Sequence, residues 1–185
     1  MVLTPLSAVD RSAMRWLRDR EHPNAFSLLS GDATLATLEW RSREGSFATA
    51  RNSEGEWTLK RGGFLNPHVT VRAGAGALAR LSVHLNYHQI ELAGGRSYRF
   101  HRAGLLLPAW QVNSADGTEV LHIEPAREGR HLEAGAVVVS PGATELPELL
   151  LLVVLSWYFI VLAWFEDEAV ENLHKPLEGP DWPSP

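Results

Sequence analysis

The hydrophobic pattern divides the chain into two parts. From Phe26 onward apolar and polar residues alternate in short runs, and no segment before residue 145 has an apolar stripe with the 3.6-residue period of a helix. The pattern changes at Leu149–Phe165, where LLLLVVLSWYFIVLAWF is apolar except for Ser156. The sequence therefore predicts a β-rich body followed by one hydrophobic helix.

About twelve short strands are expected in the alternating part. Their predicted ranges are 26–30, 34–40, 46–51, 56–61, 67–73, 77–85, 88–93, 97–102, 108–113, 118–124, 130–133 and 135–140. Turn residues that tolerate positive φ separate them, as in Ser30-Gly31-Asp32, Arg61-Gly62-Gly63 and Ala115-Asp116-Gly117. Short strands at this even spacing are typical of a sandwich or a barrel.

The segment before the strands predicts a short N-terminal helix within residues 1–25. Over Ser7–Glu21 a helix would place Ala13, Met14 and Leu17 on one side, and Pro23 would end it. A helix of this length usually packs over an open end of a domain. A basic amphipathic helix on a membrane surface is the alternative.

The run Leu149–Phe165 suits either the interior of a protein or the interior of a bilayer. It would rise about 25 Å, which is at the lower limit for a hydrocarbon core of about 30 Å. Acidic residues flank it on both sides, and Trp157 and Tyr158 lie near its middle, whereas membrane helices carry basic flanks and aromatic ends. We expect an enclosed helix within residues 145–165, capped by Thr144, and a transmembrane tail anchor is the alternative.

The sequence contains an internal repeat at an offset of 41 residues, which aligns Trp57–Arg72 with Tyr98–Asn113. The aligned pairs include Arg61 with Arg102, Gly63 with Gly104, Leu65 with Leu106, Pro67 with Pro108 and Val71 with Val112. Each copy predicts a strand, a glycine turn and a second strand that begins at proline. We interpret the repeat as a duplicated β-meander within one barrel.

These features resemble the superfamily that joins the tubby C-terminal domain, the LURP-one-related proteins and the phospholipid scramblases. The resemblance, to a small bacterial-type member, rests on the order of elements and on the motifs Trp57–Gly63 and Ala115–Val120. It implies a mainly β fold, a closed antiparallel barrel of about twelve strands around a central hydrophobic C-terminal helix. The barrel domain would cover 26–168, and 169–185 would form a flexible, Pro-rich acidic tail.

Charge is unevenly distributed along the chain. The net charge is −5, but residues 1–130 hold 16 of the 17 Lys and Arg, and residues 131–185 hold Lys175 and nine acids. Because arginine matches phosphate and carboxylate groups well, a phosphate-bearing partner is one interpretation. An ordinary solvated surface is the other. The negative overall charge argues against nucleic acid, and the lack of cysteine excludes disulfides and thiolate chemistry.

The repeat supplies the candidate residues for binding an anionic headgroup, Lys60, Arg61, Arg99, His101 and Arg102. Lys60, Arg99 and His101 alternate with apolar neighbours and should point outward, and the glycine turns could bring Arg61 and Arg102 close to them. A basic patch of this kind suits a phosphorylated headgroup, as the resemblance to tubby-like domains implies. The alternative is that these charges are spread around the barrel and only solvate it.

Other chemical motifs are weak. Gly74–Ala79 matches a relaxed dinucleotide-binding fingerprint, but the residues after it alternate as in a strand and no βαβ unit accompanies it. His84 and His88 lack the spacing of a metal site, and the acids after the helix lack the ligand pattern of a calcium loop. We therefore expect no metal, no cofactor and no catalytic residue.

The sequence thus favours a non-enzymatic binding module for an anionic phospholipid headgroup, or for another phosphate ligand, at a membrane surface. A structural or protein-interaction domain whose acidic tail binds a partner is the alternative, and an enzyme is the least favoured class. The start MVLTPLSAVD lacks the basic and apolar regions of a signal peptide. We expect a cytoplasmic protein, either free or associated with the membrane.

Overall fold

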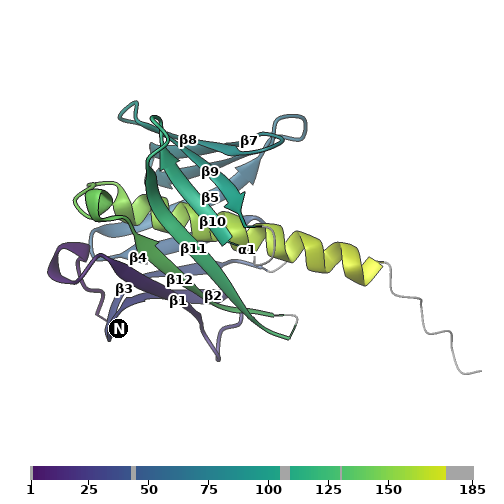
Figure 1. Cartoon of the computed structure of the whole chain (residues 1–185). Helices are drawn as coiled ribbons and strands as arrows, with labels where there is room; N and C mark the ends of the chain where they lie inside the picture. The colour runs from purple at the N-terminus through teal and green to yellow at the C-terminus, as the bar shows by residue number, and fades with distance from the viewer. Residues whose placement is uncertain (1, 43–44, 105–108, 130, 174–185) are drawn as a thin grey trace, which may run out of the picture.

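The structure, a computed structural model, describes residues 2–42, 45–104, 109–129 and 131–173. In this part of the chain twelve antiparallel strands close into a barrel around one α-helix (Figure 1). The strands are β1 (Ala13–Arg18), β2 (Ala25–Ser30), β3 (Ala33–Trp40), β4 (Phe47–Asn52), β5 (Gly55–Gly62), β6 (His68–Ala73), β7 (Gly76–Val83), β8 (His88–Leu92), β9 (Ser97–Ala103), β10 (Ala109–Ser114), β11 (Glu119–Glu128) and β12 (His131–Val139). The helix is α1 (Leu149–Leu173), and the 3₁₀ turns are η1 (Leu6–Ala8) and η2 (Pro141–Ala143).

Each strand of the barrel pairs with the strands that precede and follow it in the chain. Short loops can join such neighbours because antiparallel strands need no crossover. The barrel closes where β1 pairs with β12, in a register that sets Trp16 opposite Gly135. Closure leaves no open sheet edge for another chain to pair with. The expected fold, a closed antiparallel barrel of about twelve strands around a hydrophobic helix, is confirmed.

The helix expected over Ser7–Glu21 is wrong. Only the 3₁₀ turn η1 forms there, and Ala13–Arg18 is strand β1, in which Met14 and Trp16 point into the core. A six-residue segment fits both the 3.6-residue period of a helix and the two-residue period of a strand. Pairing with the distant strand β12 stabilises the strand. The predicted strands 130–133 and 135–140 are both parts of β12. The prediction reached twelve strands because it divided β12 into two and omitted β1.

The hydrophobic run lies inside the barrel, as Figure 1 shows for α1. Every residue from Leu149 to Tyr158 is buried, including Ser156. This confirms the enclosed helix over the tail anchor. Among the described residues, no helix combines the length and the apolar character needed to cross a bilayer.

The ends of α1 differ from the expected ones. Thr144 does not cap the helix, because its hydroxyl donates to the carbonyl of Pro141 at 3.0 Å and α1 begins only at Leu149. The helix continues past 165 to Leu173, into the range predicted as a flexible tail. The rest of that predicted tail, 174–185, lies outside the described residues.

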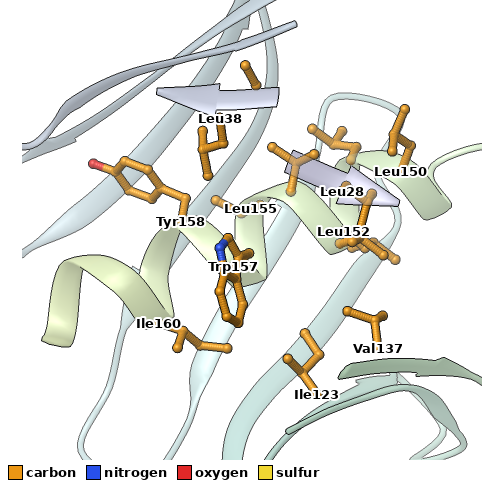
Figure 2. Close-up of a cluster of buried hydrophobic side chains, with 14 of the residues drawn as sticks. Leu28, Leu38, Ile123, Val137, Leu150, Leu152, Leu155, Trp157, Tyr158 and Ile160 are labelled. Atoms are coloured by element: carbon orange, nitrogen blue, oxygen red, sulfur yellow. The ribbon is translucent and has the colours of Figure 1, made fainter. Parts of the chain in front are cut away.

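The core explains why aromatic residues occupy the middle of α1. Trp157 stacks on Trp16 of β1 with ring centroids 5.7 Å apart, and Tyr158 stacks on Trp40 of β3 at 5.4 Å. A side chain at Gly135 would place its Cβ 2.2 Å from Cζ3 of Trp157, so this glycine leaves room for the indole. Aliphatic residues fill the remaining space, and Figure 2 shows Leu28, Leu38, Ile123 and Val137 around the helix. The large rings of the helix thus stack on tryptophans of the surrounding wall, contacts that a lipid-facing helix would not make.

Candidate functional site

The end of the barrel at which α1 begins, here called the entry end, is closed by polar contacts. The carboxylate of Glu148 is buried, accepts a hydrogen bond from the Tyr98 hydroxyl and pairs with Arg96 at 2.8 Å. Burial, and then the hydrogen bond to Glu148, raises the pKa of Tyr98 to about 12. Arg11 donates to the carbonyl of Thr144 at 2.9 Å. These contacts fix the start of the helix to the wall of the barrel.

The opposite end, here called the exit end, is where α1 leaves the barrel, and aromatic rings fill it. The guanidinium of Arg127 lies 3.8 Å from the ring centroid of Trp164, and Phe159 lies 4.3 Å from the ring of His88. Burial among these rings, and then the charge of His84, lowers the pKa of His88 to about 4. The Tyr158 hydroxyl donates to the carbonyl of Ser46, and burial raises its pKa. Apolar contacts therefore dominate at this end.

The predicted binding residues fall into two groups near the exit end. Lys60 is exposed and Arg61 half-buried at the end of β5. On β9, Arg99 and Arg102 are exposed and His101 is half-buried. Strands β6, β7 and β8 lie between the groups, which at about 4.8 Å per strand separates β5 from β9 by roughly 19 Å along the wall. The two copies of the repeat therefore form the β5–β6 and β9–β10 strand pairs, which do not pair with each other. Residues 105–108 of the second copy, with Leu106 and Pro108, lie outside the described residues.

The strands between the two groups join them into a basic sector, defined here as residues 57–114. This sector contains seven Lys and Arg and one acid, Glu91, which gives a net charge of +6. Since the whole chain carries −5, the remaining residues carry −11. Arg72 of β6 and Arg80 of β7 are exposed on the wall between the groups. A division of the sequence at residue 130 hides this concentration of charge, and counting charge strand by strand would have found it.

Apolar side chains protrude at the exit end beside these cations. Phe64 and Leu65, in the β5–β6 loop, are 99% and 87% exposed, and Leu85, in the β7–β8 loop, is 98% exposed. We call these three residues the apolar tips. The loops are neighbours, because the Val83 N–H donates to the carbonyl of Pro67 at 3.2 Å. Sequence analysis missed them, although a Phe-Leu pair inside the turn Gly-Gly-Phe-Leu-Asn-Pro is an unusual signal.

The other candidate sites have structural explanations. Gly74, with φ of +55°, lies in the hairpin between β6 and β7, so the glycine motif does not begin a nucleotide-binding helix. His84 stacks on Tyr87 with ring centroids 5.0 Å apart. Within the described ranges, no group of three His, Cys, Asp or Glu residues could hold a metal ion.

A hollow on the outer wall is the remaining candidate. Its lining includes Asp19, His22, Glu39 and Arg51, with apolar residues of β2. The single arginine there pairs with two acids, with Glu39 at 3.5 Å and with Glu56 at 3.0 Å. With Asp19 also in the lining, acids outnumber cations, so the hollow offers no excess positive charge to an anionic ligand.

No family model, curated protein or solved structure matches this chain. The chemistry of the site therefore follows from its own residues. The exit end and the basic sector offer ammonium and guanidinium groups next to exposed apolar side chains. This arrangement suits a ligand that is anionic and apolar at once.

Proposed function

We propose that the protein is a non-enzymatic binding module that attaches to anionic phospholipid headgroups at a membrane surface through its basic sector. The observation that carries the proposal is the net charge of +6 on residues 57–114, in a chain whose other residues carry −11. Lys60, Arg99 and Arg102 expose cationic groups at or near the exit end of this sector. The residues Lys60, Arg61, Arg99, His101 and Arg102 are the proposed headgroup contacts.

The separation of charge also orients the molecule. Each Lys or Arg near an anionic membrane contributes about 1 kcal/mol, and this attraction decays within a Debye length of about 8 Å. The acidic remainder is repelled from the same surface. It includes Glu166, Asp167, Glu168 and Glu171 on the part of α1 that leaves the barrel, so the bound protein must direct this part of the helix away from the membrane. A protein with this distribution therefore approaches the membrane with β5 to β9 forward. Since anionic lipids are concentrated in the cytoplasmic leaflet, the proposal places the protein at that face.

A resemblance supports the same proposal. The barrel around a central C-terminal helix is the architecture that likeness to the tubby, LURP-one-related and scramblase superfamily implies, and we propose that the chain is a member. The basic pairing by which tubby domains grip phosphoinositides is not recognisable here. The proposed contacts therefore rest on the charge and exposure of this chain alone.

Vesicle co-sedimentation tests the proposal. The wild-type chain should bind vesicles of phosphatidylcholine with phosphatidylserine, and binding should weaken as salt rises, because salt screens the attraction. Lys60→Glu with Arg99→Glu should weaken binding at least about tenfold, since four units of charge change at the surface. The matched control is Arg15→Glu with Arg20→Glu, which makes the same charge change at exposed sites outside the sector and should alter binding less than about threefold.

Two results would overturn the proposal. One is a wild-type chain that stays in solution with anionic vesicles at low salt. The other is an equal loss of binding in the two double variants, which would mean that net charge alone matters. Calorimetric titration with inorganic phosphate separates the sources of the anion. Tight binding of free phosphate without vesicle binding would replace the lipid by a soluble phosphate ligand.

A further inference from the structure

We infer that the apolar tips, Phe64, Leu65 and Leu85, enter the outer part of the bilayer when the protein binds. The inference rests on the proposed function, because the basic sector brings the exit end to the membrane. It adds a second, apolar component to the binding, carried by the β5–β6 and β7–β8 loops. Lipid is therefore contacted both at its headgroup and at the start of its acyl chains.

The exposure of the tips is the first argument. Phe64, Leu65 and Leu85 are almost entirely exposed, so their side chains contribute nothing to the core. A single exposed leucine is ordinary, but these are three apolar side chains on two loops that a backbone hydrogen bond joins at the same end of the barrel. Transfer of such side chains from water into an apolar medium is favourable in proportion to the area buried. A bilayer surface offers that medium.

The shape of the loops is the second argument, since both are held by specific contacts. Gly63 has φ of +79°, and a Cβ there would lie 2.2 Å from the carbonyl oxygen of Asn66. The turn is therefore closed tightly behind Phe64 and Leu65, and Nδ1 of His68 lies 3.0 Å from the same Asn66 oxygen. Loops held in this way insert with a small loss of conformational entropy.

The β7–β8 loop is held in a comparable way. The His84 N–H donates to the carbonyl of Tyr87 at 3.0 Å, and the two rings stack. Leu85 lies between these residues, at the tip. The guanidinium of Arg99 lies 5.7 Å from the ring centroid of Tyr87, which places a cation just behind the tip.

The charge around the apolar tips favours an anionic bilayer over another protein as their binding partner. Lys60, Arg99 and Arg102 are exposed near the tips, and from Trp57 to Ile90 the sequence contains no acid. A second copy docked on the same face would set two basic sectors against each other. Three side chains also expose far less area than the roughly 1,200–2,000 Å² that a stable protein interface buries. An anionic bilayer requires no shape complementarity, and it places phosphates where the cations lie.

An environment-sensitive label tests insertion directly. The chain has no cysteine, so Leu85→Cys carries a nitrobenzoxadiazole label at one position. With phosphatidylcholine and phosphatidylserine vesicles its emission should shift to the blue and rise several-fold, and lipids with a nitroxide near the headgroup should quench it. The matched control is Asp32→Cys, in the exposed β2–β3 turn at the entry end, whose labelled emission should not change.

Affinity gives an independent test. Phe64→Ser, Leu65→Ser and Leu85→Ser together should weaken vesicle binding at least about tenfold, and the loss should persist at salt concentrations that screen the charges. The melting temperature should not change, because the three side chains are exposed. Val138→Ser, at a side chain 53% exposed on β12 away from the exit end, should bind vesicles as the wild type does.

The outcomes separate the two proposals. If the wild type binds anionic vesicles, the triple variant binds equally well and the label stays in water, insertion is wrong and the proposed function stands. If the wild type binds no vesicles, both fail. If sedimentation velocity shows a wild-type dimer that the triple variant lacks, the tips face a second copy and insertion is overturned.

Discussion

At the entry end, α1 begins under a buried carboxylate that a tyrosine and an arginine hold, whereas at the exit end it leaves between aromatic rings. Hydrogen bonds and an ion pair have one correct geometry, so the entry end fixes the depth of the helix. Stacked rings tolerate small shifts. The exit end also carries exposed apolar residues and cations, which folding alone does not require. The difference separates a part of the molecule that stabilises the fold from a part that is available for binding.

The largest effect should come from the middle of the barrel, on which both ends depend. Gly135→Ala places a methyl group against Trp157, and we expect a loss of about 3 kcal/mol in the free energy of unfolding. Urea titration followed by tryptophan fluorescence measures it. Gly94→Ala, at a glycine with no atom within 4 Å of the added carbon, should change stability by less than about 1 kcal/mol. Equal losses would show that the indole is not held as described.

A change at the entry end should come next in size. Glu148→Ala leaves the Tyr98 hydroxyl without its acceptor in a buried site, and we expect a loss of about 2–3 kcal/mol. The exit-end counterpart, Arg127→Ala, removes one cation–π contact and should cost at most about 1 kcal/mol. Thermal unfolding compares the two variants. A larger loss in the arginine variant would reverse the assignment of the two ends.

The smallest effects should appear in the pH dependence of stability, one at each end of the barrel. His88, at the exit end, has its pKa lowered by burial from 6.5 to about 4. Its contribution to stability is therefore complete above pH 6.5 and is lost as the pH falls through 4. His88→Phe should remove this loss, on the order of 1–2 kcal/mol after screening of a partly exposed group. Between pH 6.5 and 4 the free energy of unfolding of the wild type should therefore fall by this amount more than that of the variant, and urea titrations across the range measure both. An equal fall in the two proteins would show that His88 is not held neutral by the fold.

The entry end should respond at the opposite extreme of pH. Burial raises the pKa of Tyr98 from 10 to about 12, so its contribution is complete below pH 10 and lost as the pH rises through 12. Tyr98→Phe should flatten the alkaline side of the stability profile and leave the acid side unchanged. If Tyr98→Phe instead flattened the acid side, the alkaline loss of stability could not be assigned to Tyr98 at the entry end.

Much of the fold could be predicted because the core imposes local patterns. Leu149–Phe165 has no polar face, and its acidic flanks and central Trp157 distinguish an enclosed helix from a membrane span. Most strands alternate clearly between the core and solvent. The prediction was wrong for Ala13–Arg18 because so short a segment fits both the helical and the strand period, and one of its two partner strands, β12, lies more than a hundred residues away. Such pairing leaves no mark in the local sequence.

Less of the candidate site could be predicted. The cations Lys60, Arg61, Arg99, His101 and Arg102 follow from the repeat, but the sequence does not show that β6 and β7 fill the space between them with further arginines. The predicted strand 77–85 treated Leu85 as a strand residue, whereas β7 ends at Val83 and leaves Leu85 at a loop tip. Alternation identifies apolar residues without showing where a strand ends.

Hydrogen–deuterium exchange on the full chain, with and without vesicles that contain phosphatidylserine, tests the difference between the two ends most directly. We predict that vesicles slow exchange in residues 63–67 and 84–87 at the exit end. Residues 31–34 and 141–147, at the entry end, should exchange at the same rate in both conditions. Slower exchange at the entry end, or uniform protection of all four segments, would contradict the account.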